Sequence, residues 1–395
     1  MKLVLAGPPR SGKSCFREGL KQAVRALPGA PYPYVITGCP DGEGAWFQEA
    51  MAADPAVAAA CKAAYKAAFT PEFVARVADS VRNCACELTL VDIGGRITDE
   101  NRQICAHATH GLILCAKETW DEQVPKWRDF FSSLGIPVVA EIVSDYTGAQ
   151  DKVLGQVDVF RGVVHHLERG EALAQRETVV AFATWLVQEL HQEDDESHGP
   201  AHIAAVRREA QLLAEKYASD LIDLVDEAAR LHDIGNRLGR ENHEVTGAHL
   251  VATDVSLQEK WGGRLPLIVE AVREHRASTG KPIGVVARIV SDADRLGTPE
   301  GSNPLLRAYQ YRLERGAPPS DETLLDAARH IRTKYGGSGT GTRTYFPETA
   351  AKIKAARTPI MEAYDREDLA ALRALLEGAA SPSPSNPPAR GVDGG

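Results

Sequence analysis

Histidine and aspartate residues recur in the second half of this chain in an order that suggests ligands of a divalent ion. The candidates, in chain order, are His202 in AHIAAV, His232 and Asp233 in LHDIG, His275 in REHRAS, and Asp292 and Asp294 in SDADRL. Neutral imidazole and carboxylate ligands leave a divalent ion acidic enough to activate water and to polarise a phosphoryl oxygen. The alternative is a set of buried polar side chains with ordinary hydrogen bonds, and the His–Asp pair alone does not decide between the two.

This order of residues resembles the HD-domain superfamily of metal-dependent phosphohydrolases, whose signature is H…HD…D on a bundle of helices. The resemblance extends from about residue 198 to at least residue 296. It implies that His202, His232, Asp233 and Asp294 surround one divalent ion. His202 is preferred to His198 as the first ligand because it directly precedes the apolar pattern of a helix. An HD fold that has lost its metal is the alternative.

Two further histidines resemble the ligands of those HD subfamilies that bind a second ion. His243, in NHEVTGA, looks like their additional histidine segment, and His275 fits another such position. Asp233 could then bridge the two ions. Imidazole and carboxylate ligands suit Mn, Fe, Co, Ni or Zn, and the sequence does not select among these metals.

Positively charged residues near these segments are candidates to hold the phosphate of a substrate. Lys281, Arg276 and Arg295 are the three that we consider. Arg295 follows a predicted ligand within a helix, so a structural salt bridge is at least as good an interpretation of it. With Asp233, we assign Lys281 and Arg295 to the catalytic group of the predicted hydrolase.

A second group of chemically suggestive residues lies next to the N-terminus. The segment GPPRSGKS, residues 7–14, matches the phosphate-binding pattern G-x-x-x-x-G-K-[ST] at each fixed position, after a strand pattern and before a helix pattern. In that pattern, backbone N–H groups surround the phosphates, the lysine reaches the β and γ oxygens and the hydroxyl holds Mg²⁺. The predicted nucleotide ligands are Gly7, Pro8, Arg10, Ser11, Gly12, Lys13 and Ser14. A chance glycine-rich turn is the alternative.

A nucleotide with a bound metal also calls for an acidic residue at the end of a neighbouring strand. Asp92, at the end of LTLVD, fits this role, with a plain strand-end carboxylate as the alternative. The segment DIGG matches the D-x-x-G of GTPases, but no N-K-x-D pattern is present to recognise guanine. We therefore predict ATP with Mg²⁺ as the ligand.

Two neighbouring segments extend this candidate site. Asp41 and Glu43, in CPDGEGAW, could position a second substrate or Mg²⁺, although a solvated turn explains them equally well. Arg96 and Arg102 could meet a phosphate or simply lie on the surface. The segments GPPRSGKS, CPDGEGAWF and VDIGGRITDEN look like the small ATPase-like domains of some CRISPR-associated proteins, which occur fused to ring-nuclease-type modules. This resemblance covers about the first 120 residues and implies a role in antiviral defence signalling.

Two kinds of scaffold are needed to position these residues. Up to about residue 190, strand patterns at residues 2–6, 32–38, 87–95, 111–116 and 136–146 alternate with helical patterns, which is typical of an α/β domain with a mostly parallel sheet. Residues 191–200 form a polar break and predict a linker. Residues 201–378 carry helical periodicity throughout and predict an all-α HD domain. Residues 379–395 are rich in Pro, Ser and Gly and predict a disordered tail.

Composition limits the class of protein further. The 395 residues carry a formal net charge of −9, which does not favour bulk binding of nucleic acid, and 44% are hydrophobic, as expected of a globular protein. No apolar run reaches the length of a membrane span, and none of the seven cysteines forms a C-x-x-C pair. We predict a cytoplasmic protein, in which assembly into a homo-oligomer stays open.

Three functions compete on these grounds. The first is a two-domain enzyme in which an ATP-binding P-loop domain is joined to an HD domain that hydrolyses a phosphoester in a nucleotide or oligonucleotide. The second is a P-loop kinase or ATPase with a regulatory or product-reversing HD domain. The third is a nonenzymatic nucleotide sensor of a defence or signalling system.

Overall fold

The computed structural model describes residues 1–39, 69–168, 170–191, 199–298, 303–337, 339 and 343–380. It consists of two compact units. The first comprises Met1–Gln192 with Thr253–Glu259, and the second comprises Glu193–Ala252 with Lys260–Gly395. The division between them falls inside the predicted linker, but the return of a short helical segment to the first unit has no signal in the sequence.

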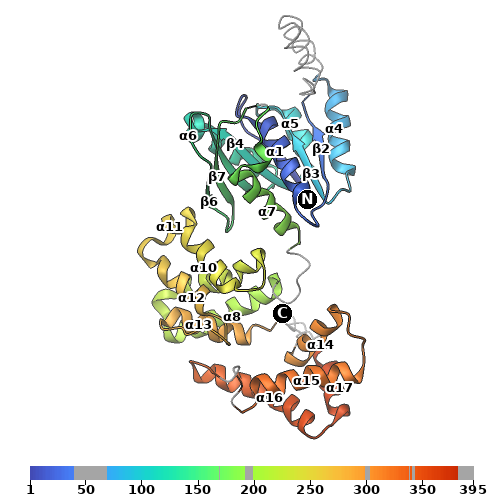
Figure 1. Ribbon diagram of the computed structural model, residues 1–395, viewed down its shortest axis with the longest axis vertical. Helices are drawn as coiled ribbons and strands as arrows, with labels where there is room; N and C mark the ends of the chain where they lie inside the picture. Colours follow the sequence, from blue (N-terminus) through green and yellow to red (C-terminus); the bar gives the residue numbers. More distant parts are fainter. Residues whose placement is uncertain are drawn as a thin grey trace, which may run out of the picture. The chain divides into compact units, whose positions relative to one another are not determined.

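The first unit is built on a seven-stranded sheet with the order β2-β3-β1-β4-β5-β7-β6 (Figure 1). Its strands are β1 (Lys2–Ala6), β2 (Pro33–Thr37), β3 (Leu88–Asp92), β4 (His110–Ala116), β5 (Val138–Asp145), β6 (Lys152–Gly155) and β7 (Phe160–His165). All neighbouring strands pair in parallel except β6, which is antiparallel to β7. The predicted mostly parallel sheet is therefore confirmed, and β6 and β7 are strands that the sequence patterns did not indicate.

Helices cover both faces of this sheet (Figure 1). Because successive side chains of a strand point to opposite faces, Leu3 and Leu5 of β1 pack in one core and Val4 and Ala6 in another. The first core includes side chains of α1 (Lys13–Ala26) and α7 (Glu177–His191). The second includes those of α4 (Pro71–Asn83), α5 (Asp99–Cys105) and α6 (Trp120–Ser133).

The sheet order brings the predicted nucleotide ligands to one edge. The glycine-rich segment joins the carboxyl end of β1 to the start of α1, and Asp92 is the last residue of the adjacent strand β3. Leu5 of β1 is paired with Asp92 across the two strands. Because parallel strands end at the same edge of a sheet, this register places the acidic residue beside the glycine-rich segment.

Among its described residues, the second unit contains helices and no strand, as predicted. Its helices are α8 (Pro200–Tyr217), α9 (Ile222–Leu231), α10 (His243–Thr253), α12 (Leu265–Glu274), α13 (Val285–Leu296), α14 (Pro304–Glu314), α15 (Asp321–Tyr335), α16 (Pro347–Asp365) and α17 (Leu369–Ala380), whereas most residues of α11 (Val255–Trp261) belong to the first unit. The division between the units falls within α10 and α11. The last four helices share a core of their own. Helix α17 extends two residues into the predicted tail, and residues 381–395 lie outside the described residues.

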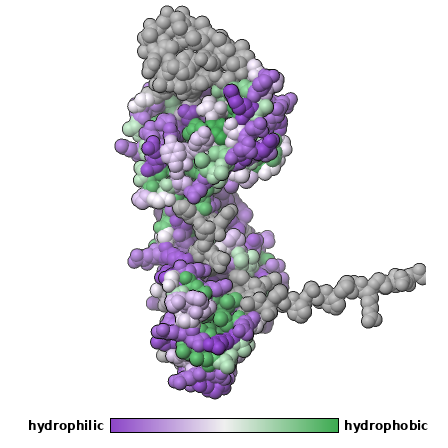
Figure 2. Space-filling view, turned by 90° about the vertical axis from the view of Figure 1, so that its right-hand side faces the viewer, coloured by the Kyte–Doolittle hydropathy of each residue, from purple (hydrophilic) through white to green (hydrophobic). Residues whose placement is uncertain are grey.

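Figure 2 shows hydrophilic residues in purple over most of the described surface on the face that it presents, with smaller hydrophobic areas in green between them. None of the described helices combines the length and the apolarity needed to cross a bilayer.

Candidate functional site

The predicted metal ligands all lie at the ends of helices. His202 is in the first turn of α8, and His243 is the first residue of α10. Helix α9 ends at Leu231, so the His–Asp pair follows it directly. His275 likewise follows the last residue of α12, and Asp294 is in the last turn of α13. Helix packing therefore gathers residues that lie up to 92 positions apart (294 − 202).

A first group of ligand atoms comprises two imidazoles and two carboxylates. The Nε2 atom of His202 lies 3.4 Å from Oδ1 of Asp294 and 3.8 Å from Oδ2 of Asp233. The Nε2 atom of His232 lies 3.3 Å from Oδ2 of Asp233 and 3.7 Å from Oδ1 of Asp294. The four residues of the minimal HD signature thus direct one atom each toward a common point.

A second group adjoins the first and uses the other oxygen of Asp233. The Nε2 atoms of His243 and His275 lie 3.2 Å and 3.4 Å from Oδ1 of Asp233, and 3.2 Å from each other. The two oxygens of one carboxylate therefore face two separate pairs of imidazoles. This is the geometry expected of a bridging ligand.

The four imidazoles are held in one orientation by their second nitrogen atom. In His202, His232, His243 and His275, Nδ1 lies 2.7–3.1 Å from a backbone carbonyl oxygen. For the last three, this carbonyl belongs to the residue three positions earlier, and for His232 and His275 it lies in the last turn of a helix, where carbonyls lack intrahelical partners. A carbonyl only accepts, so Nδ1 donates and the Nε2 lone pair of a neutral ring points into the group, as in metal-binding histidines.

The donor atoms fit divalent ions. Nε2 of His232 is fully buried and makes no well-aligned hydrogen bond among the described residues, although Oδ2 of Asp233 lies 3.3 Å away, so a bound cation would satisfy it better. Ligand atoms about 2.1 Å from an ion are about 3.0 Å apart in octahedral and about 3.4 Å apart in tetrahedral coordination. The separations within both groups, 3.2–3.8 Å, are close to these values. Mixed imidazole and carboxylate donors suit the transition metals.

The charges of the two groups predict competition between protons and metal. Burial disfavours the charged form of His232, but the carboxylates of Asp233 and Asp294 and the carbonyl of Ala229 together outweigh this effect and raise the pKa of His232 to about 9. Burial acts to raise the pKa of Asp233 and Asp294, yet the neighbouring imidazoles lower the pKa of both carboxyls below the usual range. In the absence of an ion, the ionised carboxylates therefore retain a proton on His232. A cation that binds must displace this proton, so the affinity for metal is expected to decrease as the pH decreases.

A glycine contact positions the second group. A Cβ atom on Gly235, in the HDIG segment, would overlap the backbone carbonyl oxygen of His243 and crowd the backbone of Gly247. The absence of a side chain at Gly235 therefore allows the start of α10 to pack against the segment that follows Asp233.

Replacing Gly235 with alanine is expected to displace α10 and to remove the ion of the second group while that of the first remains. The overlap is with backbone, so a destabilisation of about 1–3 kcal/mol should accompany it. Metal content after dialysis and urea unfolding measure the two effects. Gly263→Ala is the matched control, because a Cβ there meets nothing within 4 Å. Full occupancy of both groups in the Gly235 variant would contradict this explanation.

The predicted phosphate ligands of this unit lie outside the two groups. Lys281 is exposed in the loop before α13, and its backbone N–H donates to a carboxylate oxygen of Glu274. Nη1 of Arg295 lies 2.8 Å from Oδ1 of Asp292, and both side chains are buried. This is the structural salt bridge that was the alternative for Arg295. Their roles in binding phosphate stay predictions.

Other residues near the second group include one that sequence reasoning missed. Glu244 is buried, and its Oε2 lies 3.6 Å from Nδ1 of His243 and 3.3 Å from Nη1 of Arg276. Its only signal in the sequence is its position next to His243. His198 lies outside the described residues.

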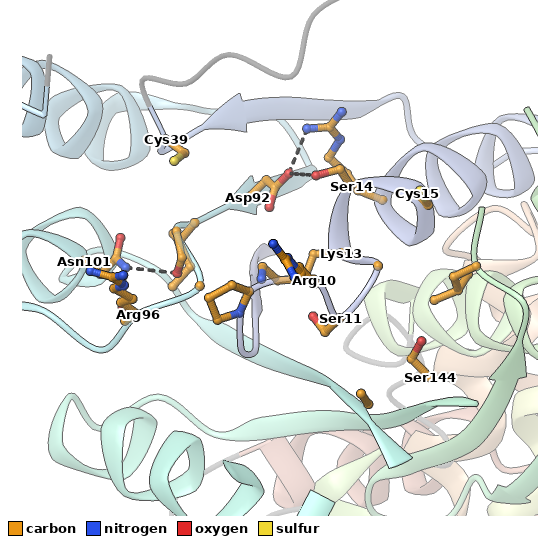
Figure 3. Close-up of a pocket in the computed structure, with 18 of the residues that line it drawn as sticks. Arg10, Ser11, Lys13, Ser14, Cys15, Cys39, Asp92, Arg96, Asn101 and Ser144 are labelled. Atoms are coloured by element: carbon orange, nitrogen blue, oxygen red, sulfur yellow. Dashed lines mark hydrogen bonds and ion pairs between the residues drawn. The ribbon is translucent and has the colours of Figure 1, made fainter. Parts of the chain in front are cut away.

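The glycine-rich segment of the first unit borders a pocket of about 1540 Å³ (Figure 3). Ser14 Oγ lies 3.4 Å from Oδ2 of Asp92, so the two side chains for which a shared cation is predicted lie close together. Nζ of Lys13 donates to the carbonyl oxygens of Gly7 and Pro8 at 2.9 and 3.0 Å. Asp92 also accepts from Nη1 of Arg17 at 2.8 Å, a contact that the sequence patterns did not indicate.

The remaining predicted residues of this site are distributed as follows. Arg10, Ser11, Gly12 and Arg96 line the pocket with Lys13, Ser14 and Asp92, whereas Gly7, Pro8 and Arg102 do not. Nη1 of Arg102 donates to Oγ of Ser133. Asp41 and Glu43 lie outside the described residues. A Cβ atom on Gly7 would overlap the carbonyl oxygen of Leu114, and its φ of 139° also favours glycine.

Comparison with known proteins supports the assignment of the second unit. Residues 201–298, which include all six predicted metal ligands, match the HD domain family. A search of curated proteins returned no match. The family match and the two ligand groups support a metal-dependent hydrolase with a divalent-ion site. The match covers only residues 201–298, so the resemblance of the first 120 residues to CRISPR-associated ATPase-like domains stays a prediction.

Proposed function

We propose that the second unit is a metal-dependent phosphohydrolase that cleaves a phosphoester bond in a nucleotide or oligonucleotide. The observation that carries this proposal is the placement of Asp233, whose two oxygens serve two groups of imidazoles that already point their Nε2 atoms at it. An ordinary buried hydrogen-bond network does not need four imidazoles that all direct Nδ1 to a backbone carbonyl and Nε2 toward the carboxylates.

The residues of the chain contribute position and charge to this chemistry. Divalent ions bound at the two groups would supply the Lewis acidity that activates water and offsets charge on the phosphoryl oxygens. The bonds from Nδ1 to backbone carbonyls keep the four imidazoles oriented before any ligand binds. Asp233 couples the two groups, so that a substrate bound at one is held at a constant distance from the other. Burial of the imidazoles keeps bulk water away from their side of the site.

Reconstitution with single metals tests this function. Protein stripped with a chelator and reloaded with Mn, Fe, Co, Ni or Zn should hydrolyse at least one member of a panel of nucleotides, cyclic nucleotides and short oligonucleotides. The activity should disappear when His232 is replaced by alanine and should not require ATP. Product formation that survives both the chelator and His232→Ala would assign the hydrolysis to another site, and no hydrolysis with any metal would refute the proposal.

We further propose that the pocket of the first unit binds ATP with Mg²⁺. The observation that favours it is the approach of Ser14 Oγ to Asp92 beside a lysine in a glycine-rich segment. Backbone N–H groups at the start of α1 would surround the phosphates, and the oxygens of Ser14 and Asp92 are the type of ligand that Mg²⁺ prefers.

The competing functions differ in what happens to ATP. A kinase or ATPase that carries a regulatory or product-reversing HD domain would turn ATP over in the first unit, with transfer to an acceptor in the kinase case. A nonenzymatic sensor, for example in defence signalling of the CRISPR type, would bind ATP and show no turnover in either unit. Parallel measurement of ATP consumption and of metal-dependent ester hydrolysis separates these functions.

A further inference from the structure

The exposure of the ligands indicates where a substrate can reach the metal groups. The side chain of Asp294 is 25% exposed, whereas those of His202 and His232 are 3% and 0% exposed. Those of Asp233, His275 and His243 are also 11% exposed or less. The ligand groups are therefore most accessible beside Asp294.

An arginine from outside the family match contacts the segment that follows Asp294. Arg307 is in the first turn of α14, beyond residue 298 where the match ends. Its Nη1 donates to the carbonyl oxygen of Gly297 at 3.1 Å, and the same oxygen lies 2.8 Å from Nδ1 of His202. One backbone oxygen thus ties the guanidinium group of Arg307 to the imidazole of a predicted ligand.

The electrostatic surroundings of Arg307 include both ligand carboxylates. Burial lowers its pKa, and the negative charges of Asp294 and Asp233 act in the opposite direction. The positive charge of Arg357, on α16, also lowers the pKa of Arg307. Arg307 is therefore a partly desolvated cation within electrostatic range of the metal groups and of a second arginine.

Arg357 is buried beside the end of α13. The residue as a whole is 5% exposed, and its Nη2 donates to the carbonyl oxygen of Arg295 at 2.9 Å. Its Nε atom is buried without a hydrogen-bond partner among the described residues. Two arginines, from α14 and α16, therefore meet the carboxyl end of the helix that carries Asp294.

The balance of charge favours an anion at this place. Two carboxylates, Asp233 and Asp294, contribute to the ligand groups. The positive charge of two divalent ions would be larger than the negative charge of these two carboxylates. Arg307 and Arg357 add to the excess. A guanidinium group presents N–H donors in a planar fork that matches the oxygens of a phosphate, and such bonds are stronger when both partners are charged.

We propose that Arg307 binds the phosphoryl group of the substrate at the accessible side of the metal groups. This inference rests on the proposed phosphohydrolase function and names the residue that recognises the phosphate. Arg357 acts as a positioning residue, because it holds the carboxyl end of α13 against α16. Arg307 thereby takes the role for which the sequence offered Lys281 and Arg295.

Inorganic phosphate is the probe that tests this role without relying on turnover. Full-length protein with Lys13→Ala, in which the glycine-rich segment is impaired as a phosphate site, is loaded with Mn²⁺ and titrated with phosphate by calorimetry. Adding Arg307→Gln should weaken the metal-dependent binding of phosphate at least about tenfold, with the Mn²⁺ content unchanged. Arg307→Lys should retain part of the affinity. Arg315→Gln, an exposed arginine that follows the same helix, is the matched control and should bind as the parent does.

The outcomes separate this inference from the proposed function. If the parent binds phosphate only with Mn²⁺ and Arg307→Gln binds it equally well, the inference is wrong and the phosphohydrolase proposal stands. If Arg307→Gln and Arg307→Lys both lose Mn²⁺, Arg307 supports the ligands and does not bind substrate. If the Mn²⁺-loaded parent binds no phosphate and hydrolyses no member of the substrate panel, both proposals fail.

Discussion

Replacing Asp233 with asparagine is expected to empty both ligand groups and to lower kcat/KM for phosphoester hydrolysis by about 10³-fold or more. Asparagine has nearly the same shape, but it removes the negative charge and replaces one of the two oxygens that face His232 on one side and His243 on the other. Each ion would lose a charged ligand at once. Metal content after dialysis and steady-state kinetics with a substrate from the panel measure the effect.

Two further variants make this result specific. Asp294→Asn removes a ligand of the first group alone, so it should cost one ion and spare the other. Asp223→Asn, an exposed acid of the helix that precedes the His–Asp pair, is the matched control and should keep both ions and full activity. An Asp233→Asn protein that keeps two ions per chain would show that this carboxylate does not bridge them.

Replacing Lys13 with alanine is expected to weaken the binding of ATP with Mg²⁺ by about 10²-fold or more. The ammonium group of Lys13 lies against the carbonyl oxygens of Gly7 and Pro8, at the point where the phosphates of a nucleotide would displace those contacts. Without it, the segment would lose its only lysine donor to the phosphate oxygens. Calorimetric titration with ATP and Mg²⁺ measures the affinity.

Lys21→Ala is the matched control for this variant. Lys21 belongs to the same helix, and its ammonium group pairs with Glu18 at 4.0 Å and does not line the pocket. The Lys21→Ala variant should bind ATP with the same affinity as the unchanged protein. Equal affinity of the Lys13 variant and the unchanged protein for ATP would remove the proposal of a nucleotide site, and the metal content of the second unit should be the same in all three proteins.

Short segments of sequence were sufficient to predict the local structure at both candidate sites. The glycine-rich segment lies between a strand and a helix as expected, because the residues that determine its path, such as Gly7 with its φ of 139° and Gly12 at the start of α1, are contiguous. Helical periodicity predicted the all-helical second unit for the same reason. Strand β6 was missed because it has only four residues, and β7 was missed because Arg161 and Gly162 interrupt its apolar residues, although Phe160 and Val164 are fully buried.

Residue types and their order also determined which side chains were candidates for ligands. Sequence alone did not show which of the two carboxylates, Asp292 or Asp294, faces the ligand group. Asp292 and Asp294 are two residues apart on α13 and so point to different sides of the helix. The structure turns Asp294 toward His202, while Asp292 accepts from Arg295 and from the backbone of Tyr345 and Phe346. Which side faces the ligands depends on packing against α8 and α16 and not on the local pattern.

The sequence thus determined which side chains are candidate ligands and which chemistry they predict, because imidazole and carboxylate groups retain their donor properties in any fold. Only the tertiary structure decided that the two oxygens of Asp233 face different imidazoles and that Arg307 and His202 share the carbonyl oxygen of Gly297. These relations join residues on separate helices, and they arise from burying the apolar faces of those helices together. No periodicity within a single segment encodes such a relation, because the packing energy depends on all the helices at once.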